Sequence, residues 1–182
     1  MRIVAGTARG RKLNTPTGME IRPTTDKVKE AMFSILQFDL PGRKVLDLFA
    51  GTGQLGLEAL SRGAAKALFV DSSKKAAELI RANVKLSGFS ERSTVVQGDA
   101  FAFLASTNEK FDLVLLDPPY EKGLCEKAAA VLPRVLSENA IVVCETRPEE
   151  ALPESIGPLT VYREYKYSAI RLTVYKSRLT EE

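Results

Sequence analysis

The sequence predicts an α/β protein built on a mostly parallel sheet of seven strands, and three observations support this prediction. From residue 43 onward, short apolar segments of strand type alternate with amphipathic segments of helix type. The strand-type segments are apolar throughout, as expected when helices cover both faces of a parallel sheet. Near the C-terminus two strand-type segments follow each other without a helix, which predicts an antiparallel hairpin at the edge of the sheet.

Composition places the chain among ordinary soluble proteins. It has 182 residues, of which 45% are apolar and 27% are charged, enough for one domain with its own core. No signal peptide is visible and no apolar run approaches the ~20 residues of a membrane span, so we expect a cytoplasmic protein. We also expect it to be a monomer. The chain has no histidine, and Cys125 and Cys144 lack metal-ligand spacing. We therefore expect no bound metal.

Residues 1–18 are expected to form a small basic β-hairpin arm. Four basic side chains and no acid lie in this segment, and two glycines mark its turns. Arg9, Arg11 and Lys12 lie at or just after the turn, where they could grip phosphates. Residues 1–44 carry nine basic and four acidic side chains, which suggests a polyanionic partner. The alternative is a merely basic, solvated terminus.

The remaining elements follow from periodicity and capping signals. Thr24 or Thr25 can cap a helix that ends near Pro41, and its charged residues, such as Lys29, are expected to face outward or into a cleft. Further helices are predicted at about 54–62, from the Ser72 or Ser73 cap to 87, from 99, and around 124–132. Strands are predicted at 45–48, 67–70, 93–96, 112–116, 141–144, 159–165 and 168–175, the last two joined at Lys166-Tyr167. Residues 19–176 would form the main domain and 177–182 a polar tail.

The loops that follow the first four strands all carry an acid: Asp47, Asp71, Asp99 and Asp117. In an open parallel sheet a ligand lies beyond the carboxyl ends of the strands, so these acids should converge on one crevice. Asp71 is placed to accept hydrogen bonds from ribose hydroxyls, and Asp99 could similarly receive an adenine amine. The sequence therefore predicts a site for a nucleoside-like cofactor.

The glycines of residues 51–56 also fit the dinucleotide fingerprint G-x-G-x-x-G, with an acid about 20 residues later. On this pattern alone, a nicotinamide-dependent oxidoreductase is a fair hypothesis. Gly51 and Gly53 let the backbone approach a ligand closely. However, residues 47–50 separate the strand from the glycines, and the Asp47 carboxylate would repel a pyrophosphate. S-adenosylmethionine, with its sulfonium and ammonium groups, suits an acid-lined crevice better.

The segment Asp117-Pro118-Pro119-Tyr120 predicts a site for a flat base that bears an amine. The Asp117 carboxylate and the Pro118 carbonyl can accept the two hydrogens of the amine and aim its lone pair at a methyl group. The prolines fix the loop, and Tyr120 offers a ring on which an extruded base can stack. The alternative is a plain turn with a packed tyrosine.

In the order of these motifs the chain resembles the RsmD family, bacterial methyltransferases that modify guanine N2 in 16S ribosomal RNA. The resemblance covers residues 1 to about 176 and includes Met1 to Gly6, Arg9 to Leu13, Arg22 to Phe33 and the two loops above. It implies a Rossmann-like class I methyltransferase fold, S-adenosylmethionine as cofactor, and the small ribosomal subunit or its assembly intermediate as partner.

The resemblance also assigns roles to residues. It implies catalytic roles for Asp117, Pro118, Pro119 and Tyr120. It implies RNA contacts for Arg9, Arg11, Lys12 and Arg22, although Arg22 could instead brace the cofactor pocket. It implies cofactor contacts for Asp47, Phe49, Ala50, Gly51, Gly53, Asp71, Ser72, Asp99 and Ala100. Three other functions stay open at this point: an adenine-N6 methyltransferase acting on DNA or another RNA, a NAD-dependent oxidoreductase, and a non-catalytic RNA-binding assembly factor.

Overall fold

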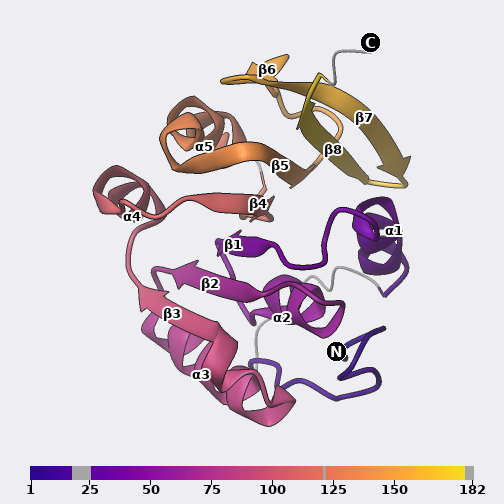
Figure 1. Cartoon of the computed structure of the whole chain (residues 1–182), viewed down its shortest axis with the longest axis vertical. Helices are drawn as coiled ribbons and strands as arrows, with labels where there is room; N and C mark the ends of the chain where they lie inside the picture. Colours follow the sequence, from indigo (N-terminus) through magenta and orange to yellow (C-terminus); the bar gives the residue numbers. More distant parts are fainter. Residues whose placement is uncertain (18–25, 121, 179–182) are drawn as a thin grey trace.

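The computed structural model describes residues 1–17, 26–120 and 122–178, which are arranged around one mixed sheet (Figure 1). Its strands are β1 (Lys44–Leu48), β2 (Lys66–Asp71), β3 (Ser93–Gln97), β4 (Phe111–Leu116), β5 (Leu136–Thr146), β6 (Ser155–Ile156), β7 (Leu159–Tyr167) and β8 (Ile170–Ser177). Its helices are α1 (Asp26–Leu36), α2 (Gln54–Ser61), α3 (Lys74–Ser87), α4 (Ala100–Ser106) and α5 (Leu124–Val131), with 3₁₀ turns η1 (Ser90–Arg92) and η2 (Leu132–Val135).

The strand order β3-β2-β1-β4-β5-β8-β7-β6 confirms the predicted open α/β sheet. Strands β1 to β5 pair in parallel, whereas β5–β8, β8–β7 and β7–β6 pair in antiparallel fashion. The chain builds the sheet outward from β1 to β3 and then returns to place β4 on the other side of β1. Because the order reverses there, the loops after β1 and β4 diverge and leave room for a ligand beyond the strand ends.

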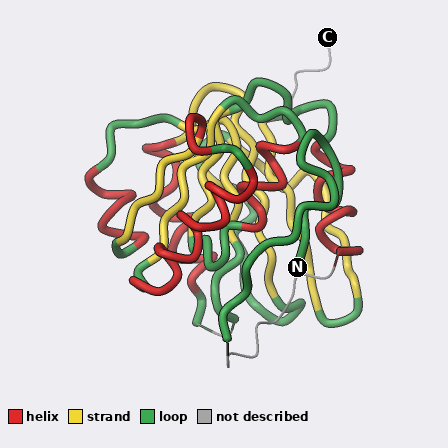
Figure 2. The backbone as a smooth tube through the Cα atoms, turned by 90° about the horizontal axis from the view of Figure 1, so that it is seen from below, coloured by secondary structure: helices red, strands yellow, loops and turns green. Residues whose placement is uncertain are grey.

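Helices cover both faces of this sheet, as the all-apolar strands predicted (Figure 2). One core cluster joins the sheet to α1, α2 and α3, and the other joins it to α4, α5 and η2. Successive residues of β4 alternate between the two clusters: Leu113 and Leu115 belong to the first, and Val114 and Leu116 to the second. This alternation fixes which side chains at the strand ends face the same way.

Several predicted boundaries are wrong. In the described part of the chain the sheet has eight strands and not seven, because the two-residue strand β6 pairs with the start of β7. Strand β5 begins at Leu136, five residues before its predicted start. The prediction missed these residues because they are partly exposed and form no apolar run. The turn between β7 and β8 lies at Ser168, whose φ is 52°, and not at Lys166-Tyr167. Thr24 and Thr25 lie outside the described residues.

Residues 1–17 pair with each other as expected of a hairpin, but in this described part of the segment the β-pairing consists of a single bridge, Arg2 with Lys12. The Ile3 amide donates to the Arg11 carbonyl at 2.9 Å, and the Leu13 amide donates to the Met1 carbonyl at 3.0 Å. Ile3 and Leu13 are buried in the same core cluster as α1 and α2. The basic segment is therefore packed onto the body of the protein.

A buried polar cluster attaches this segment to α2. The Glu58 carboxylate, which is fully buried, accepts hydrogen bonds from the amides of Val4 (2.9 Å) and Ala5 (3.0 Å). Lys29 is also buried, contrary to the prediction that it faces outward or into a cleft. Its ammonium lies 3.8 Å from Glu58 and donates to the Arg2 carbonyl at 2.6 Å. Burial lowers the pKa of Lys29, and the negative charge of Glu58 opposes this shift.

Gly6 allows the chain to pass close to the end of α2. Its φ is +84°, and a Cβ at this position would lie 1.9 Å from the Ser61 carbonyl oxygen. The Ser61 hydroxyl accepts a hydrogen bond from the Ala8 amide at 3.0 Å and donates one to the Ala5 carbonyl at 2.6 Å. A side chain at residue 6 would therefore separate the two elements.

Candidate active site

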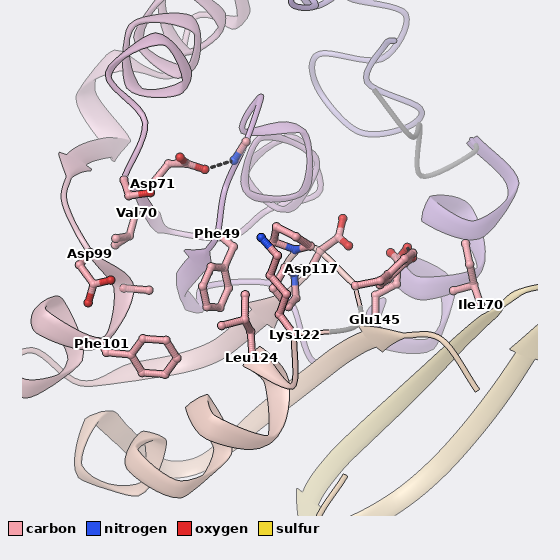
Figure 3. Close-up of a pocket in the computed structure, with 16 residues that line it drawn as sticks. Phe49, Val70, Asp71, Asp99, Phe101, Asp117, Lys122, Leu124, Glu145 and Ile170 are labelled. Carbon is pink, nitrogen blue, oxygen red and sulfur yellow. Dashed lines mark hydrogen bonds between the residues drawn. The ribbon is translucent and has the colours of Figure 1, made fainter. Parts of the chain in front are cut away.

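A cavity of about 560 Å³ opens beyond the carboxyl ends of β1, β2 and β4 (Figure 3). We call its two sides the Asp71 end and the Asp117 end, which lie on opposite sides of Phe49 in Figure 3. The Asp71 end is lined by Phe49, Gly51, Val70, Asp71, Ser72, Asp99, Ala100 and Phe101. The Asp117 end is lined by Asp117, Pro118, Pro119, Tyr120, Lys122, Leu124, Glu145 and Ile170. The structure thus brings most of the predicted site residues together.

Asp71 holds the glycine-containing loop in place. Its Oδ2 accepts a hydrogen bond from the Gly51 amide at 2.9 Å, and its Oδ1 accepts one from the Ser73 amide at 2.9 Å. A carboxylate has about four lone-pair positions, so it can accept further hydrogen bonds from a ligand. Asp71 therefore both shapes the loop and offers an acceptor to the cavity.

Two aromatic rings form an apolar wall in this part of the cavity. The rings of Phe49 and Phe101 meet edge to face with centroids 6.2 Å apart. Phe49 has a φ of 64°, a left-handed conformation that is uncommon for a residue with a large side chain. Such strain costs of the order of 1–3 kcal/mol and is concentrated at functional sites. Asp99 accepts a hydrogen bond from the Ala102 amide at 2.8 Å and so caps α4.

Three of the predicted cofactor contacts do not line the cavity: Asp47, Ala50 and Gly53. Asp47 is 1% exposed, and its carboxylate accepts a hydrogen bond from the Gly56 amide at 2.9 Å. It therefore supplies the first turn of α2 with an acceptor, because Gly53, at the cap position with a φ of 79°, has no side chain to do so. These three residues therefore support the conformation of the loop without lining the cavity. Burial raises the pKa of Asp47 to about 7.

We expect the wild-type protein to lose stability between pH 5 and pH 8 as Asp47 ionises. In the Asp47→Asn variant this loss should be smaller. The pKa of Asp47 is about 7 when folded and near its ordinary value of 3.8 when unfolded. Its contribution to stability is therefore complete below about pH 4 and is lost as the pH rises through 7. Asparagine keeps the acceptor for Gly56 without the charge. Urea unfolding at both pH values measures the difference, and an equal pH dependence in both proteins would contradict the assignment.

The Asp117 end combines fixed and charged groups. Pro118 is buried, and Asp117 directly follows the last residue of β4. The Tyr120 hydroxyl donates a hydrogen bond to Glu145 Oε1 at 2.8 Å. The guanidinium of Arg147 lies over the Tyr120 ring, 5.6 Å from its centroid. The ring is thus held at its hydroxyl and at one face.

Sequence reasoning missed six residues of the cavity wall: Val70, Phe101, Lys122, Leu124, Glu145 and Ile170. Val70 and Phe101 adjoin predicted site residues, so their positions could have been inferred. Glu145 and Ile170 come from β5 and β8, and the pairing of β4 with β5 and of β5 with β8 brings them to the cavity. No local pattern in the sequence signals this.

Arg9, Arg11 and Lys12, three of the four predicted RNA-binding residues, lie outside this cavity. Arg9 lines a second cleft of about 380 Å³ together with Arg2 and Arg62. The Arg11 guanidinium donates to the Leu86 carbonyl at 2.8 Å in the last turn of α3, so this residue also has a structural contact. Lys12 is exposed. The fourth predicted residue, Arg22, lies outside the described residues.

Within the described ranges, no helix is long and apolar enough to cross a membrane. Among the same residues, no three His, Cys, Asp or Glu side chains are grouped so that they could hold a metal ion.

The sheet, with its parallel centre and antiparallel end, has the class I methyltransferase fold. A family model described as Conserved hypothetical protein 95 matches residues 1–176. The chain belongs to this family, the RsmD family.

Three relatives illustrate the similarity. Ribosomal RNA small subunit methyltransferase D of Escherichia coli K12 is 35% identical over 97% of this chain and 89% of its own length. The Bacillus subtilis protein YlbH is 37% identical over 98% of this chain and 100% of its own length. The solved structure of the Escherichia coli protein yhhF superposes with a TM-score of 0.87 at 32% identity and covers 97% of both chains.

Proposed function

We propose that the protein transfers the methyl group of S-adenosylmethionine to the exocyclic N2 amine of a guanine in 16S ribosomal RNA of the small subunit. One observation carries this proposal: the acidic Asp71 end and the Asp117-Pro118-Pro119-Tyr120 end belong to the same cavity. A cofactor and a base bound at the two ends would meet inside it. The names of the relatives, which include a small-subunit ribosomal RNA methyltransferase, support the RNA substrate.

The groups that line the cavity fit S-adenosylmethionine. Asp71 and Asp99 are acidic, and none of the described residues that line the Asp71 end is basic. Such a surface favours a ligand with a sulfonium and an ammonium group. Asp71 would accept hydrogen bonds from the ribose hydroxyls, and Phe49 and Phe101 would flank the adenine. When bound, the cofactor supplies an electrophilic methyl group.

The residues of the Asp117 end would orient the base. The Asp117 carboxylate and the Pro118 carbonyl accept the two N2 hydrogens, which localises the lone pair of the amine and aims it at the methyl group. The proton that the amine loses leaves along the hydrogen bond to Asp117. Arg147 covers one face of the Tyr120 ring. The base would stack on the other face of this ring. Orientation of this kind can supply much of the rate enhancement.

We also propose that the arm of residues 1–18 binds phosphates of the RNA, that residues 19–176 form the catalytic domain, and that residues 177–182 are a tail outside it. A monomer in the cytoplasm, where small subunits assemble, accords with this function.

We expect the double variant Arg9→Gln/Lys12→Gln to bind the RNA substrate more weakly. Both side chains are exposed, and Lys12 pairs with Arg2 through the backbone alone. If each contacts one phosphate, the slope of log K against log salt should fall by roughly 1.4–1.8. Filter binding at several salt concentrations measures this slope. The control is the variant Lys127→Gln, which removes an exposed charge from α5. An unchanged slope in the double variant would show that Arg9 and Lys12 of the arm do not contact the RNA.

The proposal is tested by incubating the protein with methyl-labelled S-adenosylmethionine and small subunits from a strain that lacks the gene. Naked ribosomal RNA and DNA are tested in parallel, and nucleosides are analysed. We expect the label in N2-methylguanosine from subunits. Label in N6-methyladenine would replace guanine with adenine as the target. Cofactor binding without label in any substrate would favour a non-catalytic assembly factor.

A further inference from the structure

Glu145 is a buried carboxylate in the wall of the Asp117 end, and only 2% of its surface is exposed. A buried charge is costly unless it is paired through hydrogen bonds. The Tyr120 hydroxyl supplies such a bond, at 2.8 Å to Oε1. A hydroxyl that donates to an ionised carboxylate forms one of the stronger hydrogen bonds in proteins. The contact therefore constrains both side chains.

The strand register shows which of the two side chains is the fixed one. Leu116, the last residue of β4, lies opposite Cys144 of β5 on strands about 4.8 Å apart, so Asp117, which follows β4, is next to Glu145 of β5. Glu145 is also paired with Leu172 of β8 on its other side. The sheet thus sets the position of Glu145 from both sides.

Tyr120, in contrast, lies four residues beyond the end of β4, in the loop that leads to α5. The described residues of this loop belong to no strand, so side-chain contacts contribute to where the ring lies. The hydroxyl contact to Glu145 and the cation–π contact with Arg147, at 5.6 Å, are two of these contacts. Together they hold the ring at its hydroxyl and at one face.

We propose that Glu145 is a positioning residue that holds the Tyr120 ring as the stacking surface for the target base. This role rests on the proposed methyl transfer. Glu145 acts through Tyr120 and does not touch the base. The stacking surface is thereby tied to β5, the strand beside Asp117, so that the ring and the polarising carboxylate keep a constant relative position.

Three variants test the role in the methyl-transfer assay. Glu145→Leu removes the acceptor, Glu145→Gln keeps an amide oxygen that can accept from Tyr120, and Tyr120→Phe removes the donor. We expect Glu145→Leu and Tyr120→Phe each to lower kcat/KM roughly tenfold, mainly through kcat, and the double variant Glu145→Leu/Tyr120→Phe to lose no more than either alone. Glu145→Gln should stay within about twofold of the wild type. Affinity for S-adenosylmethionine, measured by calorimetry, should be unchanged in all of them.

A second measurement does not depend on the methyl acceptor. The protein is labelled with 3-fluorotyrosine at its five tyrosines, and the ¹⁹F resonance of Tyr120 is assigned from the Tyr120→Phe variant. The resonance should shift in Glu145→Leu and return close to its wild-type position in Glu145→Gln. An unchanged resonance in Glu145→Leu, additive losses in the double variant, or a Gln variant as impaired as the Leu variant would each overturn the proposal. The last result would indicate that the charge of Glu145 contacts the base.

Discussion

Replacing Asp117 by alanine is expected to reduce methyl transfer by roughly 10²–10³-fold, the loss typical of removing one preorganised polar group from an active site. The amine of a base is a poor nucleophile because its lone pair is delocalised into the ring, and Asp117 is the charged acceptor that we place against its hydrogens. The loss should appear in kcat. Affinity for S-adenosylmethionine should remain within a few-fold, because Asp117 lies at the opposite end of the cavity from Asp71.

Two further variants sharpen this experiment. Asp117→Asn keeps an acceptor oxygen without the charge, so its activity should lie between those of the wild type and the alanine variant. Glu126→Ala removes an exposed carboxylate from α5, outside the cavity lining, and should leave the activity unchanged. Full activity of Asp117→Ala would show that another group accepts the hydrogens of the amine.

The largest loss of stability is expected for Glu58→Ala, about 3–5 kcal/mol in the free energy of unfolding. The substitution removes the acceptor for the amides of Val4 and Ala5 and leaves the buried Lys29 without its counter-charge. The pKa of Lys29, already lowered by burial, should fall further because Glu58 is the stronger of the two charges, with Asp26, that raise it.

Urea unfolding measures the Glu58→Ala effect, with Glu78→Ala on the exposed face of α3 as the matched control. Proteolysis within residues 1–17 should become faster in Glu58→Ala than in the control. A loss of stability below about 1 kcal/mol, the usual size of a surface effect, would show that the buried cluster does not hold the N-terminal segment.

Much of the fold could be predicted because its signals are local. Apolar strands, helix caps and glycines identified β1 to β4 within a residue or two, and parallel strands necessarily bring Asp71, Asp99 and Asp117 to the same edge. Strand β6 is two residues long and has no periodicity to detect. Such an element is defined by its partner strand alone.

The site was predicted less completely, and Asp47 shows why. We expected its carboxylate to face the ligand, but it faces the first turn of α2. Alternation along β1 could have indicated this, because Asp47 lies on the same side of the strand as Val45, whose side chain packs in the cluster of α1, α2 and α3. Glu145, in contrast, depends on the register between β4 and β5, which a single sequence does not specify.

The attachment of the N-terminal segment has a consequence for synthesis of the chain on the ribosome. Arg11 bonds to Leu86, 75 positions later, and the Asn14 amide bonds to Asn83, 69 positions later. At about 5–20 residues per second, Arg11 and Asn14 would wait roughly 4–15 s for these partners to be synthesised. During this interval the N-terminal segment lacks the contacts with α3 that hold it in the folded protein, so its final position is set late in synthesis.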